Sequence, residues 1–338
     1  MKTQLIIGTD EAGYGPNLGP LVITATAWTI PHDLRCDELW GRLSRVLTNN
    51  PDRDDSRLYI ADSKQVYSPA SGLLDLETGV LSCLATLGNL PGTDVELGCL
   101  LAGDDYPEMQ SQQPDAQISH SEIPVAADGD ELSLFTQQLL QEFSATGIRL
   151  AAVRSRIVFP SEFNNMVSES GSKGVVLSGC TLSLVRDLCR RFGVGEQSEI
   201  GDNPSSTDDS SAAVEGVSVF CDKHGGRNRY DEVISEIFGD QFVFRQEEST
   251  SSSRYRMGNI QFCFRTKAEE LLPVALASMV SKYLREVLMI RFNEFWRQHV
   301  PGLKPTKGYP LDAKRFREQI ADQAAALGIT ENRFWRMR

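Results

Sequence analysis

The sequence predicts an α/β fold, a sheet flanked by helices. Apolar, β-branched strand patterns recur along the chain, and helical patterns with apolar residues every three or four positions lie between them. The 338 residues, 41% of them hydrophobic, are enough to bury a full core. We therefore expect a single domain over residues 1–338.

The strands are predicted from β-branched content and alternation. Gln4–Gly8 is apolar, Leu21–Trp28 alternates like a half-buried strand, and a Gly- and Pro-rich connection joins the two. Further strands are expected at about 149–159 and at 216–222. Helices are expected at about 36–48, 131–145, 175–192 and 267–296. Pro273 falls in the first turn of the last helix, where proline is tolerated.

Charge is distributed unevenly along the chain. The net charge of −12 opposes binding to phosphate, but residues 104–131 and 196–215 together hold fourteen acids and no lysine or arginine. The tail Lys304–Arg338 carries eight basic residues against four acids. Because the excess of acids is confined to two segments, a locally basic groove elsewhere is compatible with the composition.

The same segments suggest how the domain is organised. We expect insertions at about 104–131, 193–215 and 246–257, with serine-rich stretches at 205–211 and 247–253 that are mobile at the surface. A helical, substrate-binding C-terminal part is expected at about 284–338.

Neither a membrane span nor a disulfide framework is predicted. No apolar run approaches the roughly 20 residues that a bilayer requires, and no basic flank or cleavage site follows Met1, so we expect a cytoplasmic protein. Seven cysteines lie singly, without C-x-x-C spacing, which favours free buried thiols.

Two adjacent acids, Asp10 and Glu11, follow the first apolar strand and precede Gly13-Tyr14-Gly15. Carboxylates are hard ligands that suit Mg²⁺ or Mn²⁺. Neighbouring strand residues point to opposite faces, so joint ligation requires a bend, which the glycines permit. A solvated acidic turn is the competing interpretation of the dipeptide alone.

The glycines do not indicate a nucleotide-binding loop. The spacing Gly13-x-Gly15-x-x-x-Gly19 differs from G-x-G-x-x-G and leads into a strand, and no Gly-Lys-Ser/Thr follows. Dinucleotide or P-loop binding is therefore not expected.

Residues 8–22, GTDEAGYGPNLGPLV, closely resemble the opening active-site motif of type 2 ribonucleases H, the HII and HIII families. Further resemblances follow in order along nearly the whole chain: Asp62-Ser63-Lys64, the strand ending in Asp222, Lys267-Ala268-Glu269 before an Ala-Ser-rich helix at 277–282, and Lys307-Gly308-Tyr309-Pro310.

The resemblance implies an RNase H-like fold, with a mixed five-stranded sheet flanked by helices and a helical C-terminal extension. It also implies endonucleolytic cleavage of the RNA strand of an RNA/DNA hybrid, or at ribonucleotides embedded in duplex DNA, leaving 3′-hydroxyl and 5′-phosphate ends. The expected cofactor is a pair of Mg²⁺ or Mn²⁺ ions. The implied ligands and catalytic residues are Asp10, Glu11, Asp222 and Glu269.

Substrate contacts are implied in the same way. The backbone of Gly13, Tyr14 and Gly15 is expected near the ribose 2′-hydroxyl, which distinguishes RNA from DNA. The phosphate-binding candidates are Lys64, Lys282 and Lys307, although a solvated surface role suits any single lysine equally well. Tyr309 is a candidate for stacking on a base or sugar, with core packing as the stronger alternative.

The chain departs from the family pattern at several positions. Tyr14 stands where ribonucleases HII have arginine between the glycines, so charge assistance is lost there. A glutamate as fourth acid resembles the HIII family, and the adjacent Glu270 is an alternative ligand. Asp231 is a weaker alternative to Asp222, and His224 is either a proton-transfer group or polar surface.

Two other functions remain open from the sequence. One is a nuclease of the same fold with a different nucleic-acid target. The other is a catalytically silent nucleic-acid-binding relative, which is disfavoured because four unneeded carboxylates at one site would destabilise the fold. We expect a monomer, since a site of this kind needs no second subunit.

Overall fold

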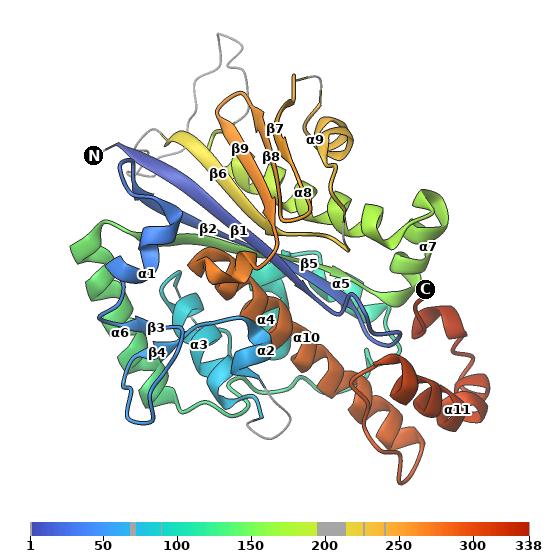
Figure 1. The fold of residues 1–338 in the computed structure, drawn as a ribbon. Helices are drawn as coiled ribbons and strands as arrows, with labels where there is room; N and C mark the ends of the chain where they lie inside the picture. Colours follow the sequence, from blue (N-terminus) through green and yellow to red (C-terminus); the bar gives the residue numbers. More distant parts are fainter. Residues whose placement is uncertain are drawn as a thin grey trace.

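The computed structural model describes residues 2–67, 72–88, 90–194, 214–225, 227–239 and 241–337. Its centre is a seven-stranded mixed sheet with helices on both faces (Figure 1). The predicted mixed α/β architecture is therefore confirmed, whereas the expected number of five strands is too low.

The sheet has the strand order β5-β2-β1-β6-β9-β8-β7. The first five strands in this order, starting from the edge strand β5, are β5 (Arg149–Val158), β2 (Leu21–Pro31), β1 (Thr3–Ala12), β6 (Val214–Asp222) and β9 (Ile260–Arg265). β1 pairs with β2 antiparallel, but β6 runs parallel to β1 and β9 parallel to β6. The carboxyl ends of β1, β6 and β9 therefore meet at one end of the sheet.

The two additional strands form a hairpin, β7 (Phe244–Glu248) and β8 (Ser252–Met257), which pairs with β9. The interpretation of 247–253 as a mobile insertion missed this hairpin, because serine and charge mask the alternation. In β8 every second residue, namely Ser253, Tyr255 and Met257, is buried on the sheet.

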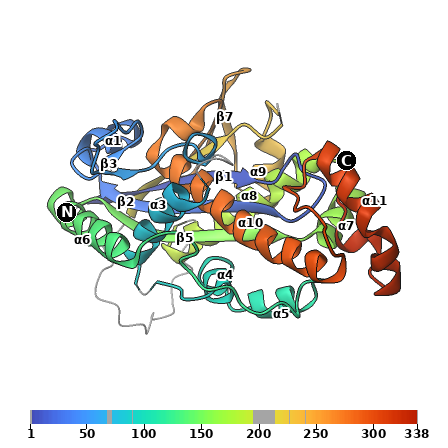
Figure 2. The same cartoon turned by 90° about the horizontal axis from the view of Figure 1, so that it is seen from below.

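One face of the sheet is covered by α10 (Leu272–His299), with α3 (Leu74–Ala85), α4 (Asp94–Ala102) and α6 (Gly129–Thr146) around it (Figure 2). α10 lies directly on β1 and β2. At Gly8 an added Cβ would lie 2.4 Å from the backbone carbon of Pro273, so glycine permits this close approach.

The opposite face is covered by α7 (Pro160–Ser170), α8 (Lys173–Arg191) and α9 (Asp231–Phe238) (Figure 1). The alternation of β1 explains both layers: Leu5 and Ile7 belong to this core, and Ile6 to the core under α10.

Residues 284–337 are largely helical. The second half of α10 packs with α11 (Pro310–Ala326) around Trp296, Phe316 and Phe334. A short 3-10 turn, η3 (Glu331–Arg333), follows, and the chain then returns to α7, where Asn164 Nδ2 donates to the Trp335 carbonyl at 2.8 Å.

Two predicted helices differ from the structure. The helix expected at 36–48 is only η1 (Cys36–Glu38) and α1 (Leu39–Arg42), because β3 (Leu47–Thr48) pairs with β4 (Leu58–Tyr59) and interrupts the pattern. The helix expected from residue 267 begins at Leu272, because Pro273 sets its first turn. Residues before it form the 3-10 turn η2 (Ala268–Glu270).

The acidic segment 104–131 is packed against the domain. It contains α5 (Tyr106–Ser111), and its Asp115, together with Asp94 of α4, lies beside the buried Arg291 of α10. Most of the insertion expected at 193–215 lies outside the described residues. All seven cysteines are free, five of them buried. No helix among the described residues is long and apolar enough to cross a bilayer.

Candidate active site

Four predicted acids lie at the carboxyl end of the parallel strands. Asp10 and Glu11 are the last acidic residues of β1, Asp222 ends β6, and Glu269 lies in η2, directly after β9. The pairing of β1 with β6 ends at Thr9 and Cys221. Asp10 and Asp222 therefore follow the last paired residues of adjacent parallel strands and lie next to each other.

These carboxylates destabilise one another's charged form. Burial, together with the charges of neighbouring carboxylates, raises the pKa of Asp10 to about 7 and that of Glu11 to about 8; the charge of Asp222 acts on both, and that of Asp10 acts on Glu11. Burial also raises the pKa values of Asp222 and Glu269. Like charges thus gather where the protein supplies too little positive charge to neutralise them.

A fifth acid, Asp62, joins this group and was not predicted as a site residue. Its charge raises the pKa values of Asp10, Asp222 and Glu269. Its side chain accepts the Lys64 N–H at 3.2 Å, which makes it the N-cap of α2 (Ser63–Val66). The Asp-Ser-Lys triplet contained this signal, but it is equally typical of an ordinary helix start. We call Asp10, Glu11, Asp62, Asp222 and Glu269 the acid cluster.

Helix α10 supports the acid cluster with two serines. The Ser278 hydroxyl lies 3.4 Å from Asp62 Oδ1 and also hydrogen-bonds the Asp10 carboxylate. The Ser281 hydroxyl donates to the Asp10 carbonyl at 3.0 Å. These contacts tie β1, α2 and α10 together at the site.

The turn before α10 separates two adjacent glutamates. Lys267, at φ 58°, is the one non-glycine residue with positive φ in the described ranges, and the Ala268 N–H after it bonds Asp222. Glu269 then faces the acid cluster, whereas Glu270 is exposed and pairs with Arg265 at 2.9 Å. This geometry favours Glu269 over Glu270.

No three His, Cys, Asp or Glu side chains in the described part of the chain form a ready-made metal-binding group. The chemistry of the acid cluster nevertheless fits a hard divalent cation, because it offers only carboxylate oxygens and their charges are mutually repulsive. Ligation requires the side chains to turn toward one another from the positions that they occupy here.

The loop after the first acids has an open side. Gly13 takes φ 91°, and an added Cβ there would lie 2.5 Å from Arg285 Nε. Tyr14 turns toward α8, with its hydroxyl 3.0 Å from where a Cβ on Gly225 would lie. A Cβ on Gly15 would meet no atom within 4 Å, so Gly15 faces open space that an incoming molecule can approach.

Two predicted lysines meet on a glutamate that the prediction missed. Lys282 Nζ lies 2.6 Å from Glu286 Oε1, and Lys307 Nζ bonds the other carboxylate oxygen. Tyr67 donates to Glu286 at 3.0 Å, and its ring lies 4.4 Å from Lys282 Nζ. We call Lys282, Lys307, Tyr67 and Glu286 the lysine cluster.

Charge is balanced in the lysine cluster. Glu286 is 2% exposed, and although burial raises its pKa, the two lysines outweigh this and leave the pKa lowered. Nothing in the helical pattern distinguishes Glu286 from a surface acid. Lys64 is different, because it is exposed, 3.9 Å from Asp62, and therefore the lysine that faces the acid cluster.

Three further residues can be placed. Tyr309 is 56% exposed, so core packing is excluded. His224 is buried, with Nδ1 3.0 Å from the Ser178 hydroxyl, so it is not polar surface, and burial lowers its pKa to about 3, which keeps it neutral. Asp231 pairs with Arg229 at 3.7 Å in α9 and does not join the acid cluster.

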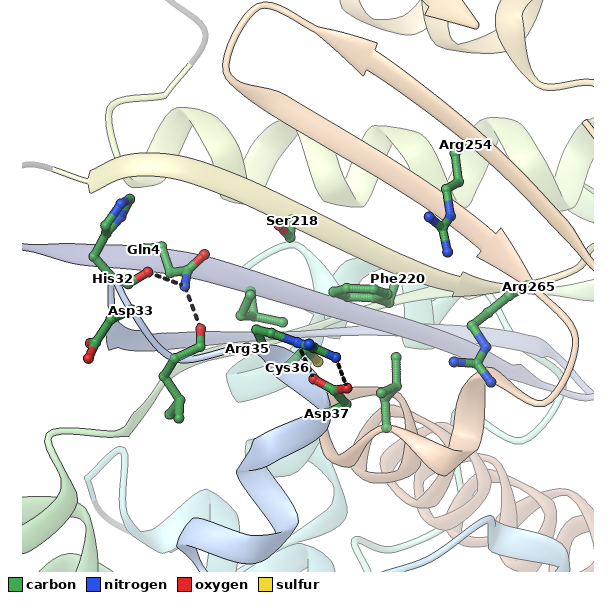
Figure 3. Close-up of a pocket in the computed structure, with 13 residues that line it drawn as sticks. Gln4, His32, Asp33, Arg35, Cys36, Asp37, Ser218, Phe220, Arg254 and Arg265 are labelled. Atoms are coloured by element: carbon green, nitrogen blue, oxygen red, sulfur yellow. Dashed lines mark hydrogen bonds and ion pairs between the residues drawn. The ribbon is translucent and has the colours of Figure 1, made fainter. Parts of the chain in front are cut away.

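A pocket lies outside the acid cluster, on the sheet face beside η1. This trough, of about 450 Å³, runs over β1 and β6 toward β8 and β9 (Figure 3). Three arginines line it, and each pairs with a neighbouring carboxylate: Arg35 with Asp37, Arg254 with Glu247 and Arg265 with Glu270. Its charges are matched within the protein, unlike those of the acid cluster.

No protein-family model and no curated protein sequence matches the chain. Among solved structures, it is similar to ribonuclease HII of Archaeoglobus fulgidus in complex with PCNA, at 15% identity and a TM-score of 0.42, over 99% of this chain and 94% of that one. It is also similar to ribonuclease H2 of Pyrococcus horikoshii, at 14% identity and a TM-score of 0.43, over 98% of this chain and 92% of that one. A third similar structure is Bst-RNase HIII in complex with Mn²⁺, at 10% identity and a TM-score of 0.40, over 99% of this chain and 66% of that one.

Proposed function

We propose that the protein is a metal-dependent endoribonuclease that cuts the RNA strand of RNA/DNA hybrids, or DNA at embedded ribonucleotides, to 3′-hydroxyl and 5′-phosphate ends. The acid cluster is the observation that carries the proposal. Five carboxylates lie together near the carboxyl ends of three parallel strands, and the pKa values of Asp10, Glu11, Asp222 and Glu269 are raised although the charge of Lys64 opposes the shift at the last three. Such an arrangement lowers the stability of the fold unless a cation binds there.

Asp10, Glu11, Asp222 and Glu269 are the proposed ligands and catalytic residues. Bound Mg²⁺ or Mn²⁺ would supply Lewis acidity for activating water and for the leaving oxygen. Asp62 adds negative charge beside these ligands, and Ser278 orients both Asp62 and Asp10. In this proposal the carboxylates would hold the cation, and the serine contacts would orient two of them toward the scissile phosphate.

Substrate contacts are proposed on both sides of the acid cluster. Gly15 leaves the backbone of Gly13–Gly15 open to the ribose, and Lys64 is free of burial to meet a phosphate. Lys282 and Lys307 would meet the next phosphates, with Glu286 holding both ammonium groups in place. The exposed Tyr309 is available to stack on a sugar or base.

The proposal is tested with three end-labelled duplexes of one sequence: an RNA/DNA hybrid, DNA with one ribonucleotide, and all-DNA. We expect cleavage that requires Mg²⁺ or Mn²⁺, occurs only at ribonucleotides, and is lost in Asp10→Asn. The ratio of the first two rates then defines the substrate. If folded protein cuts none of the duplexes with either metal, the proposal is wrong.

A catalytically silent nucleic-acid-binding relative is the second candidate. It is favoured by the lack of a ready-made metal-binding group among the described residues. In that case the duplexes would be bound but never cut, and Asp10→Asn would leave binding unchanged.

As part of the main proposal, that of an endoribonuclease, we place the enzyme in the cytoplasm as a monomer.

A further inference from the structure

Arg336, in the C-terminal segment, forms hydrogen bonds with the loop that follows Asp10 and Glu11. The Arg336 guanidinium donates through Nη2 to the carbonyls of both Gly13 and Pro16. The backbone joins in, since Arg336 N–H donates to the Asn17 carbonyl at 2.8 Å and Asn17 Nδ2 donates to the Arg336 carbonyl at 3.1 Å. Residues more than 300 positions apart in sequence are therefore locked together beside the acid cluster.

These contacts fix the direction of two peptide planes. In a planar trans peptide the C=O and the following N–H point in opposite directions. Because the Pro16 carbonyl faces Arg336, the Asn17 N–H must point away from it, and it does so, donating to Gly308 at 2.8 Å. By the same geometry the Tyr14 N–H points away from Arg336, and it has no acceptor in the described parts of the chain.

Arg336 also brings a positive charge that no carboxylate neutralises within the described ranges. It is fully buried, its Nε and Nη1 have no hydrogen-bond partner there, and its other contact is the ring of Phe163, 4.9 Å away. A second buried guanidinium, Arg285, lies under Gly13 and donates to the carbonyls of Leu18 at 3.0 Å and Pro20 at 3.3 Å. The charge of Glu286 acts favourably on Arg285. Burying the unneutralised charge of Arg336 beside it is costly unless an anion outside interacts with it.

We propose that Arg336, supported by Arg285, is a positioning residue for the bound strand. Arg336 turns the Tyr14 N–H outward toward a ribose oxygen and supplies, from beneath the loop, the positive charge that Tyr14 itself does not carry. The inference rests on the proposed function, because it assumes that the strand passes over Gly13–Gly15. It assigns the last residues of the chain to recognition of RNA.

The test measures binding without cleavage. In an Asp10→Asn background with EDTA, fluorescence anisotropy gives the Kd of a 16-base-pair RNA/DNA hybrid and of the matching DNA duplex. Arg336→Met removes the positive charge and the guanidinium hydrogen bonds to the two carbonyls, but it keeps an apolar side chain of similar length. We expect about tenfold weaker hybrid binding and about threefold weaker DNA binding, so the preference for the hybrid shrinks.

Arg336→Lys separates the effect of the charge from the effect on the orientation of the loop carbonyls, because an ammonium group lacks the planar geometry with which the guanidinium binds both carbonyls. We expect DNA binding to return to within about twofold of the parent, while the preference for the hybrid stays reduced. The matched control is Arg333→Met, which removes the same charge from the same segment but whose guanidinium contacts the Gln112 carbonyl instead of the loop. It is expected to leave the preference unchanged.

Thermal melting of each variant shows whether it is folded at the assay temperature. If Arg336→Met is not, Arg336→Lys carries the test. An unchanged hybrid preference in a folded Arg336 variant, or an equal loss in Arg333→Met, overturns the inference. Failure of the proposed function looks different, since wild-type protein would then cut nothing yet still prefer the hybrid in an Arg336-dependent way.

Discussion

Helix α10 contacts two groups of acids that differ in their charge balance. In the lysine cluster, Glu286 is almost fully buried, yet two lysines neutralise it, Tyr67 donates a hydrogen bond to it, and its pKa is lowered. In the acid cluster, reached through Ser278 and Ser281, five carboxylates share too little positive charge and the pKa of Asp10 is raised. The first arrangement stabilises the fold by itself, whereas the second becomes favourable only when a cation arrives.

Removing one acid from the acid cluster should have the largest effect. Asp10→Asn is expected to lower the rate of hybrid cleavage by about 10³-fold or more, because a proposed metal ligand is lost. In EDTA at pH 8 the free energy of unfolding of the same variant, measured by urea denaturation, should be higher than that of the wild type by about 1 kcal/mol, because one repelling charge is gone. Asp322→Asn, on the exposed surface of α11, is the control and should change neither quantity. Loss of stability in Asp10→Asn would contradict the charge imbalance described here.

The opposite sign is expected in the lysine cluster. Glu286→Gln leaves Lys282 and Lys307 without their shared carboxylate, so the free energy of unfolding should fall by about 2–3 kcal/mol. Urea denaturation measures the change. Glu294→Gln, on the same helix but near the surface, where Arg297 and Gln298 contact its carboxylate, should cost less than about 0.5 kcal/mol. Equal effects at the two positions would remove the distinction between the clusters.

The two clusters also differ in pH dependence. The pKa values of Asp10, about 7, and Glu11, about 8, are raised above those of the unfolded chain, so the folded state binds more protons in that range. Metal-free stability should therefore fall as pH rises from 6.5 to 8.5, by about 1–2 kcal/mol. His224, whose pKa is lowered to about 3, stays neutral in the folded state and weakens the fold only below about pH 6.5, outside this window.

Urea denaturation in EDTA at pH 6.5, 7.5 and 8.5 measures this dependence. The slope should be smaller in Asp10→Asn and unchanged in Glu286→Gln, since Glu286 remains charged throughout that range. Stability that is flat or rises with pH in the metal-free wild type would show that the carboxylates of the acid cluster do not repel one another as inferred.

The smallest effect concerns the turn that carries Glu269. Because Lys267 occupies the left-handed region at φ 58°, Lys267→Gly should relieve strain and stabilise the metal-free fold by about 0.5–1 kcal/mol. The same change at the exposed helical Lys314 should destabilise by about 1 kcal/mol. Destabilisation at both positions would mean that Lys267 is not strained.

Much of this was predictable from the sequence because the local signals agree with the fold. The alternation in β1 and β2, and the apolar run ending at Asp222, predicted the strands whose ends carry three of the acids. The hairpin β7–β8 was not predictable, because its burial depends on pairing with β9 and its own residues are polar. Tertiary pairing likewise overrode the helical pattern at 47–48.

The polar partners were harder to predict than the acids. Asp62 has the sequence context of a helix cap, and Glu286 that of an exposed helical acid, so only their neighbours in space reveal what they do. The contacts of Arg336 with the loop after Glu11 join the two ends of the chain, and no local pattern encodes them.

The most direct test of the central claim is whether the acid cluster binds a divalent cation. Melting temperatures of wild-type protein and Asp10→Asn would be measured in EDTA and across a MnCl₂ or MgCl₂ titration. We predict that metal raises the melting temperature of the wild type, with a gain in the free energy of unfolding of about 2–3 kcal/mol when the metal concentration is about 100 times its Kd. Metal should also remove the pH dependence of the wild-type melting temperature. It should have little effect on Asp10→Asn. An equal response of the two proteins, or no response in either, would contradict the account.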